Sequence, residues 1–281
     1  MSDSAADILM ITYNRAAYAR RSLACLLESC DDSGRIWIWQ NGSDPETMEV
    51  VHGFRHHPRV YRFHHSKENR KLRDPTNWLL SEADGEYVSK VDDDCLVPEN
   101  WLNVLRRAHK DEPQLGAIGC WRFMPEDFRP ALAERKIKEF RGGHKILTHP
   151  WVEGSGFLMK RECVKKVGLL REKESGITGY LTRVALAGWT NGWYYPFLWQ
   201  EHMDDPRAPH TLIRTDDDLQ RYLPLSAKNF GANSVEAWDA QLRRSAERLQ
   251  RLPSDPRYYA PWRAVLRRRV QRLFPSFGSG V

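Results

Sequence analysis

The chain has 281 residues, 41% hydrophobic and 28% charged, which is enough apolar material for one large α/β domain with or without an appendage. No apolar stretch approaches the roughly 18 residues of a membrane span, and the first residues do not resemble a signal peptide, so we expect a cytoplasmic protein. The five cysteines form no CxxC pair and indicate neither a disulfide framework nor a zinc site.

The first hundred residues alternate predicted strands and helices. Apolar runs predict strands over 7–14, 35–40, 60–65 and 85–94, and helical spacing predicts helices over 16–30, 45–54 and 76–83. This rhythm predicts a parallel sheet with helices on both faces and a ligand site at the carboxyl ends of the strands. Three polar clusters fall at such ends: TYNR at 12–15, QNGSD at 40–44 and VDDD at 91–94.

The second half of the chain is less regular. We predict a helix over 98–111, a strand over 115–123, a Pro- and charge-rich excursion over 124–148, a strand and short helix over 154–168, and a helix over 179–189. A strand over 192–202 should break at Pro196, because proline is disfavoured in a central strand. From about Leu219 the chain becomes arginine-rich and helical.

The triplet Asp-Asp-Asp occurs twice. At 92–94 it ends a predicted buried strand, where alternate carboxylates can bind Mg²⁺ or Mn²⁺ whose shell is completed by water and phosphate oxygens. A solvated acidic loop is the alternative. At 216–218 it precedes LQRYL, which predicts a helix N-cap and first-turn acids.

Four short motifs follow one another along the first hundred residues. They are Thr12-Tyr13-Asn14-Arg15, the QNGS of residues 40–43, the pair Asn69 and Asn77, and Gly85-Glu86-Tyr87 leading into Asp92 and Asp94. In this order and at these intervals they resemble the GT-A glycosyltransferases of family two. The resemblance extends less tightly through GSGFLMKRECVKKVG and covers roughly residues 7–205.

The resemblance implies a GT-A, Rossmann-like, mostly parallel α/β sheet and transfer of a sugar from a nucleotide-sugar donor. Asp94 would coordinate Mn²⁺ or Mg²⁺, Asp92 would contact the metal or the ribose, and His202 would be a further metal ligand, although a lone histidine is as often structural. The donor would be held by Thr12, Tyr13, Asn14, Arg15, Gln40, Asn41, Lys71, Asn77, Asp92 and Asp93. Arg73 and Arg207 are further candidates for diphosphate contacts.

Two positions depart from the family pattern. Gln40 stands where the family usually has an aspartate for the N3 proton of uracil or thymine; its amide can still accept that proton, so UDP stays the first expectation, with dTDP or GDP open. The Glu-Asp pair that supplies the base in inverting members falls at Gly176 and Ile177, and neither residue can act as a base.

A substitute carboxylate would then deprotonate the acceptor. We rank Glu153 and Asp205 ahead of Glu174, while Asp204 also follows the candidate metal histidine. Retention of configuration, an acceptor that is already anionic, or loss of activity are the alternatives.

The C-terminal 219–281 segment carries 12 Lys and Arg against 4 Asp and Glu, although the whole chain has a net charge of +6. We therefore divide the chain into a transferase domain over 1–218, with a nucleotide-binding half to about 100 and an acceptor half beyond it, and a basic helical extension over 219–281. The run PWRAVLRRRVQRLF at 261–274 predicts an amphipathic helix. Such a helix would suit binding to the inner face of a membrane and docking on its own domain equally well. The amphipathic pattern over 234–252 could also mediate a homodimer, and the lack of a base-reading motif argues against nucleic acid.

The leading hypothesis is a metal-dependent transferase that moves a sugar to a saccharide, lipid-linked or peptide acceptor, with inversion favoured by the resemblance. A sugar-phosphate nucleotidyltransferase is a rival, but TYNRAAYARR lacks the glycine-rich triphosphate loop expected there. A binding or scaffold protein on a decayed transferase fold is the non-enzymatic alternative.

Overall fold

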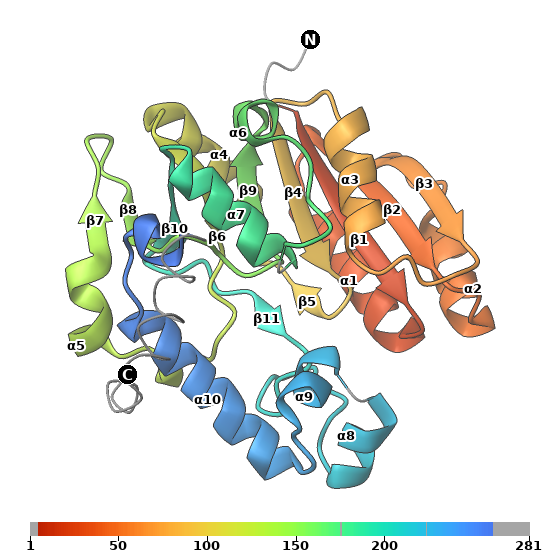
Figure 1. The fold of residues 1–281 in the computed structure, drawn as a ribbon. Helices are drawn as coiled ribbons and strands as arrows, with labels where there is room; N and C mark the ends of the chain where they lie inside the picture. Colours follow the sequence, from red (N-terminus) through yellow and green to blue (C-terminus); the bar gives the residue numbers. More distant parts are fainter. Residues whose placement is uncertain (1–4, 175, 223, 261–281) are drawn as a thin grey trace.

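A nine-stranded sheet forms the centre of the computed structural model, which describes residues 5–174, 176–222 and 224–260 (Figure 1). The order across the sheet is β3-β2-β1-β4-β9-β6-β10-β8-β7. The strands are β1 (Ala6–Tyr13), β2 (Gly34–Asn41), β3 (Val60–Ser66), β4 (Tyr87–Asp92), β6 (Leu115–Gly119), β7 (Ile137–Glu139), β8 (Lys145–Thr148), β9 (Phe157–Lys160) and β10 (Thr190–Tyr195).

The sheet is mostly parallel, as predicted. β1 pairs in parallel with β2 and β4, and β10 pairs in parallel with β6. β9 is antiparallel to both β4 and β6, and β8 is antiparallel to β10 and β7, so β8 and β9 run against the other strands. The carboxyl ends of β1, β2 and β4 therefore meet at one edge, where the three polar clusters lie.

Helices cover both faces of the sheet because the strands bury apolar side chains on both sides. In β1, Leu9 points into a cluster on one face while Ile8 and Met10 point into a cluster on the other, the alternation that a strand imposes. The first face is covered by α3 (Arg73–Glu82), α6 (Arg161–Val167) and α7 (Gly176–Leu186). The second is covered by α1 (Ala16–Ser29), α2 (Pro45–Phe54) and α4 (Trp101–Asp111).

The predicted excursion over 124–148 is not purely a loop. It contains η1 (Pro125–Asp127), α5 (Pro130–Ala133) and η2 (Glu134–Lys136), and its two short strands β7 and β8 extend the sheet. Ile146 and Leu147 of β8 are fully buried, and β8 pairs with β10, a partner more than forty residues away in sequence. That pairing overrides the charged composition on which the loop prediction was based.

The predicted break at Pro196 is present. β10 ends at Tyr195, the Tyr195–Pro196 peptide bond is cis, and the chain resumes as β11 (Glu201–His202). β11 leaves the main sheet and pairs with β5 (Cys95–Leu96) in a small antiparallel ladder. This ladder joins the segment after β4 to the segment after β10.

The chain then forms α8 (Asp216–Tyr222), α9 (Leu225–Phe230), α10 (Val235–Arg251) and η3 (Pro256–Tyr259). The second acidic triplet lies in the first turn of α8, as predicted, but the capping residue is Thr215. Its Oγ1 accepts from the Asp218 N–H at 3.2 Å, and Asp218 Oδ2 accepts from the Thr215 N–H at 2.9 Å. This reciprocal pair is a capping box.

Helix α10 is docked on the domain, beside α5 in Figure 1. Trp238, Leu242 and Ala246 form its buried face, and Gln250 bonds the backbone of Arg129 and Asp127. The domain boundary at 218 stays a prediction, and the predicted amphipathic helix over 261–274 lies outside the described residues. Within the described ranges, no helix combines the length and hydropathy needed to cross a bilayer.

Candidate active site

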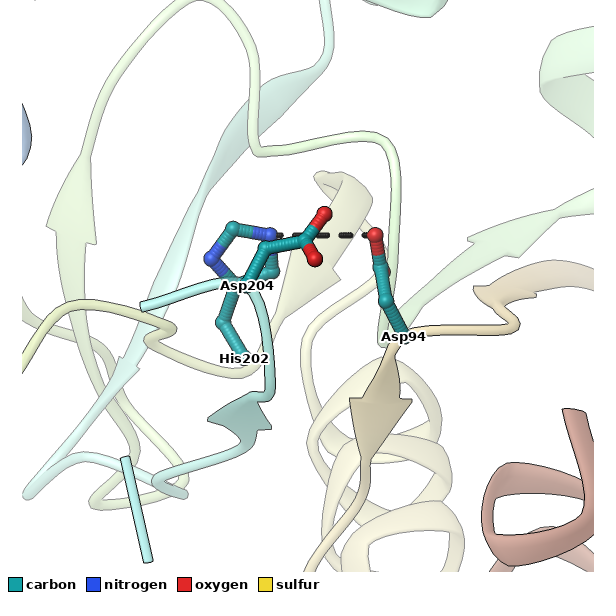
Figure 2. Close-up of side chains that lie close together, drawn as sticks. All are labelled: Asp94, His202 and Asp204. Atoms are coloured by element: carbon teal, nitrogen blue, oxygen red, sulfur yellow. Dashed lines mark ion pairs between the residues drawn. The ribbon is translucent and has the colours of Figure 1, made fainter. Parts of the chain in front are cut away.

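Three potential metal ligands, Asp94, His202 and Asp204, converge beside the β5–β11 ladder (Figure 2). Each offers one ligand atom, and these atoms all lie within 4.8 Å of one another. The ladder pairs His202 with Cys95, and the Met203 N–H donates to the Asp94 carbonyl at 2.8 Å. Residues more than a hundred positions apart are thereby held in one cluster.

Helix α10 and helix α1 hold this cluster from outside. The Trp238 indole N–H donates to the Asp204 carbonyl at 2.8 Å, and the Tyr18 hydroxyl donates to the Met203 carbonyl at 2.9 Å. Arg15 lies over the Tyr18 ring at 4.3 Å and reaches between two of the carboxylates. Its Nη1 donates to Asp94 Oδ2 and to Asp204 Oδ2, both at 3.1 Å, and its Nη2 also pairs with Asp204.

The electrostatics of the cluster are dominated by burial. Burial raises the pKa of Asp204 to about 8, with repulsion from Asp94 adding to it and Arg15 opposing it. Burial also raises the pKa of Asp93 to about 7. For Asp94, attraction to Arg15 and hydrogen bonds from Asp204 and Cys95 oppose the effect of burial, and the pKa lies below its usual value. Burial and mutual repulsion therefore disfavour negative charge on Asp93 and Asp204, and a nearby cation would oppose both effects.

The donor set fits a divalent cation. Two carboxylates and one imidazole suit Mn²⁺, and Mg²⁺ is held well by the carboxylate oxygens. Burial, together with Arg122, lowers the pKa of His202 to about 3, so its imidazole is neutral, which is the form that binds metals. The charge of Arg15 now compensates the carboxylates, a task that a divalent cation between them would share.

A cavity of about 1950 Å³ opens beside these residues. Asp92, Asp93 and Asp94 lie on its wall together with His202 and Asp204. Glu153 also lines it, and burial raises the pKa of this carboxyl group while Arg122 opposes the shift. The Trp193 indole N–H donates to Glu153 Oε2 at 2.6 Å and fixes its orientation.

The predicted donor-binding residues divide into two groups. Tyr13, Asn14, Arg15, Asp92 and Asp93 line the cavity. Four others do not line it, because their side chains bond to neighbouring residues: Thr12, Gln40, Asn41 and Asn77. Lys71 is exposed and does not line the cavity either, although Asn69, two residues earlier in the sequence, does.

The side chain of Gln40 bonds to neighbouring residues inside the fold. Its side chain is fully buried, its Oε1 accepts from Thr12 Oγ1, and its Nε2 donates to the Asn41 carbonyl at 2.8 Å. Asn77 similarly exchanges two bonds with the backbone of Leu170, at 3.0 and 2.8 Å. These amides join elements of the fold rather than facing the cavity.

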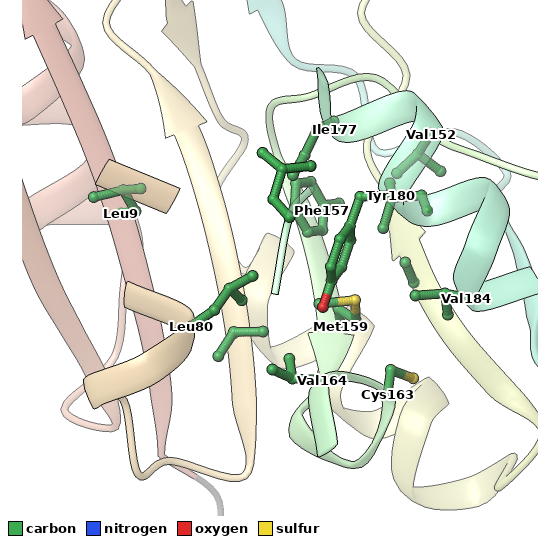
Figure 3. Close-up of a cluster of buried hydrophobic side chains, with 14 of the residues drawn as sticks. Leu9, Leu80, Val152, Phe157, Met159, Cys163, Val164, Ile177, Tyr180 and Val184 are labelled. Carbon is green, nitrogen blue, oxygen red and sulfur yellow. The ribbon is translucent and has the colours of Figure 1, made fainter. Parts of the chain in front are cut away.

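The three candidate bases also lie in different surroundings. Glu153 alone of the three lines the cavity; Asp205 is paired with Arg207, and Glu174 with Arg183. Ile177, where the family's base pair was expected, packs its side chain in the core beside Phe157 and Tyr180 (Figure 3). Its neighbour Thr178 lines the cavity instead.

Sequence reasoning missed several residues of this site. Asp204 was considered only as a base, although its position two residues after His202 places both near one ligand. The lining contributed by α9, α10 and η3 was also missed, because amphipathic helices carry no motif that points to a cavity.

Comparisons with known proteins identify the family and the fold. A family model described as glycosyl transferase family 2 matches residues 7–168. Protein CgeD of Bacillus subtilis (strain 168) is 28% identical over 117 residues, which is 38% of this chain and 27% of CgeD. The matched region thus spans about a quarter of that relative.

Solved structures share the fold at low identity. The mannosyltransferase PcManGT from Pyrobaculum calidifontis, in complex with GDP-Man and Mn²⁺, has a TM-score of 0.59 and 20% identity, over 98% of this chain and 76% of that one. GalNAc-T7 with UDP, GalNAc and Mn²⁺ has a TM-score of 0.55 and 12% identity, over 72% and 44%. TarS of S. aureus has a TM-score of 0.55 and 14% identity, over 78% and 43%.

These structures show that the fold is GT-A. Because the family model covers more than half of the sequence, the chain belongs to glycosyl transferase family 2.

Proposed function

We propose that this chain transfers a sugar from a nucleoside diphosphate sugar to an acceptor hydroxyl in a metal-dependent reaction. The observation that carries the proposal is the convergence of Asp94, His202 and Asp204 on the wall of a large cavity, at the carboxyl edge of the sheet. UDP is the first nucleotide to test, with dTDP and GDP beside it. The buried, committed amide of Gln40 gives no reason to prefer one base.

In this proposal Asp94, His202 and Asp204 hold Mn²⁺ or Mg²⁺. The bound cation neutralises the charge that grows on the departing nucleoside diphosphate. Asp92 and Asp93 lie at the same edge, where they contact the donor ribose or order water around the cation. Arg15 is the nearest protein cation to both metal-binding carboxylates, and it is placed to donate to a phosphate oxygen.

Glu153 is the proposed general base. A carboxylate with a raised pKa is matched to removing a proton from a hydroxyl as that hydroxyl attacks. The bond from Trp193 holds the carboxylate in one orientation on the cavity wall. With Glu153 as the base, a single direct displacement by the acceptor hydroxyl would invert the configuration at the sugar carbon.

The test uses Mn²⁺ with a panel of UDP-, dTDP- and GDP-sugars, and follows both nucleotide release and thermal shift. We expect one nucleotide to raise the melting temperature in the presence of Mn²⁺, and Asp94→Ala to abolish that rise. The matched control is Asp217→Ala, which removes an exposed acid from the other Asp-Asp-Asp run. If no nucleotide shifts the wild-type melting temperature with Mn²⁺, the transferase proposal is wrong.

A further inference from the structure

The cavity is chemically polarised. Its sheet edge carries the acidic cluster described above, whereas the part contributed by α9 and α10 carries four basic side chains. These are Lys228, Arg244, Arg248 and Arg251. The two ends therefore favour ligand groups of opposite charge.

The arginines share one side of α10. Residues 244, 248 and 251 are spaced by four and three positions, which places them above one another on a helix. The opposite side carries Trp238, Leu242 and Ala246, all buried. Docking of the apolar side on the domain leaves the arginine row exposed, and the row lines the cavity.

The four basic side chains of α9 and α10, called the basic wall below, are only partly neutralised by neighbouring carboxylates. Glu247 pairs with Arg251 at 2.6 Å, and Arg244 donates to the neutral amide of Gln241 at 2.9 Å. Arg248 and Lys228 make no ion pair with any described residue. One carboxylate therefore faces four cations, and the guanidinium groups are suited to bind phosphate or carboxylate oxygens.

An aromatic pair adjoins the same wall. Trp151 and Tyr259 both line the cavity, with ring centroids 4.9 Å apart and an interplanar angle of 84°. Trp151 is supported from behind by His149, whose ring centroid lies 4.1 Å away. Aromatic surface combined with a few polar or charged groups is typical of a site for a small polar ligand such as a sugar.

We infer that the acceptor is an anionic saccharide, bearing a phosphate or carboxylate group that the α10 arginines bind while its sugar ring lies against Trp151 and Tyr259. This inference rests on the proposed transferase function. The donor diphosphate is accounted for at the metal end by the ligand cluster and Arg15, so the basic wall on the other side of the cavity serves a second anion. The hydroxyl of the bound acceptor would lose its proton to Glu153 as the new glycosidic bond forms and the nucleoside diphosphate leaves.

An anionic membrane is the other partner that such cations could serve. The arrangement favours a small ligand, because Arg244 and Arg248 line a cavity together with Glu153 and the ligand cluster. A membrane-binding helix would instead present its cations beside an exposed apolar face. The apolar side of α10 is buried against the domain, and the exposed apolar side chains of α9, Leu225 and Phe230, line the cavity itself.

The experiment compares Arg244→Met/Arg248→Met with wild type and with Arg20→Met/Arg107→Met, which removes the same charge from exposed positions on α1 and α4. Calorimetric titrations use glucose 6-phosphate, glucuronate and glucose, each with and without Mn²⁺ and the nucleotide that gives the thermal shift. We expect wild type to bind at least one anionic probe about ten-fold or more tightly than glucose. The α10 double variant should lose roughly ten-fold or more of that affinity, since each arginine–oxyanion contact is worth about that much. The control pair should stay near wild type.

The Mn²⁺–nucleotide thermal shift is measured on all three proteins, so that the donor site is tested separately. Its absence from wild type contradicts the proposed function, whereas its presence without preference for an anionic probe overturns the acceptor inference alone. Loss of the shift in the α10 double variant would assign the arginines to the donor and also overturn the inference. Binding to vesicles with 30% phosphatidylglycerol that depends on Arg244 and Arg248, without preference for an anionic sugar, would assign them to a membrane.

Discussion

Arg207 is the centre of a buried ion network, and its replacement by methionine gives the sharpest stability prediction. Its guanidinium contacts Asp205 at 2.8 Å, Asp127 at 2.8 Å and Asp239 at 2.8 Å. The side chains of Asp127 and Asp205 are 2% and 3% exposed. Despite burial, which opposes the charge, bonds to Asp127 and Asp205 raise the pKa of Arg207 above its usual value.

Arg207→Met would remove the close cation from two buried carboxylates, leaving Asp127 with Arg243 at 3.6 Å. Breaking a buried ion pair on one side costs about 3–5 kcal/mol, because the remaining charge stays desolvated. For a chain of this size, 1 kcal/mol lowers the melting temperature by roughly 2–4 °C, so we expect a fall of about 10 °C. Thermal and urea unfolding, followed by tryptophan fluorescence, would measure it.

Two further variants make this prediction specific. Arg243→Met removes a cation that is 45% exposed and 3.6 Å from Asp127, and we expect a loss of at most about 1 kcal/mol. Adding Asp127→Asn and Asp205→Asn to Arg207→Met should recover much of the loss, because no buried charge then lacks a partner. A triple variant no more stable than Arg207→Met would refute the reasoning.

Two other predictions concern catalysis and acid stability. Glu153→Gln keeps an acceptor for the Trp193 N–H but removes the proposed base, so donor turnover should fall about 10²–10⁴-fold while the Mn²⁺–nucleotide thermal shift persists; unchanged turnover would exclude Glu153 as the base. Burial lowers the pKa of His109 to about 3 in the folded protein. Below pH 6.5 the unfolded chain therefore binds a proton at His109 that the folded chain does not, and the free energy of unfolding falls as the pH falls toward 3, by about 2 kcal/mol at pH 5. His109→Gln should show a correspondingly flatter loss of unfolding free energy between pH 7 and 5, and slopes that match wild type would show that His109 does not carry this dependence.

The first hundred residues of the fold could be predicted because their signals are local. DILMITYN and YVSKV are apolar runs that end in polar residues, and both are parallel strands whose ends meet at the cavity. Strands β7 and β8 could not be predicted in the same way. Their place in the sheet depends on β10, a distant segment, and not on their own composition.

The candidate site was predictable only where a motif lay on a strand end. Asp94 and His202 were both expected as metal ligands from the family pattern, but Asp204 was missed as a potential ligand because the ladder that places it has only two residues in each strand. Gln40 occupies the expected strand end, yet its side chain turns inward to Thr12. A sequence position sets the strand end, whereas the neighbouring side chains decide which way the amide points.

The family match ends at residue 168, and this boundary separates the three potential metal ligands. Asp94 lies inside the matched segment, whereas His202 and Asp204 lie beyond it, and the backbone of Asp204 is held by Trp238 still later in the chain. A fragment trimmed to the matched segment would therefore retain the family signature and lose most of the ligand set. Substitutions after residue 168 could remove two of these three potential ligands without any change in the part of the sequence by which the family is identified.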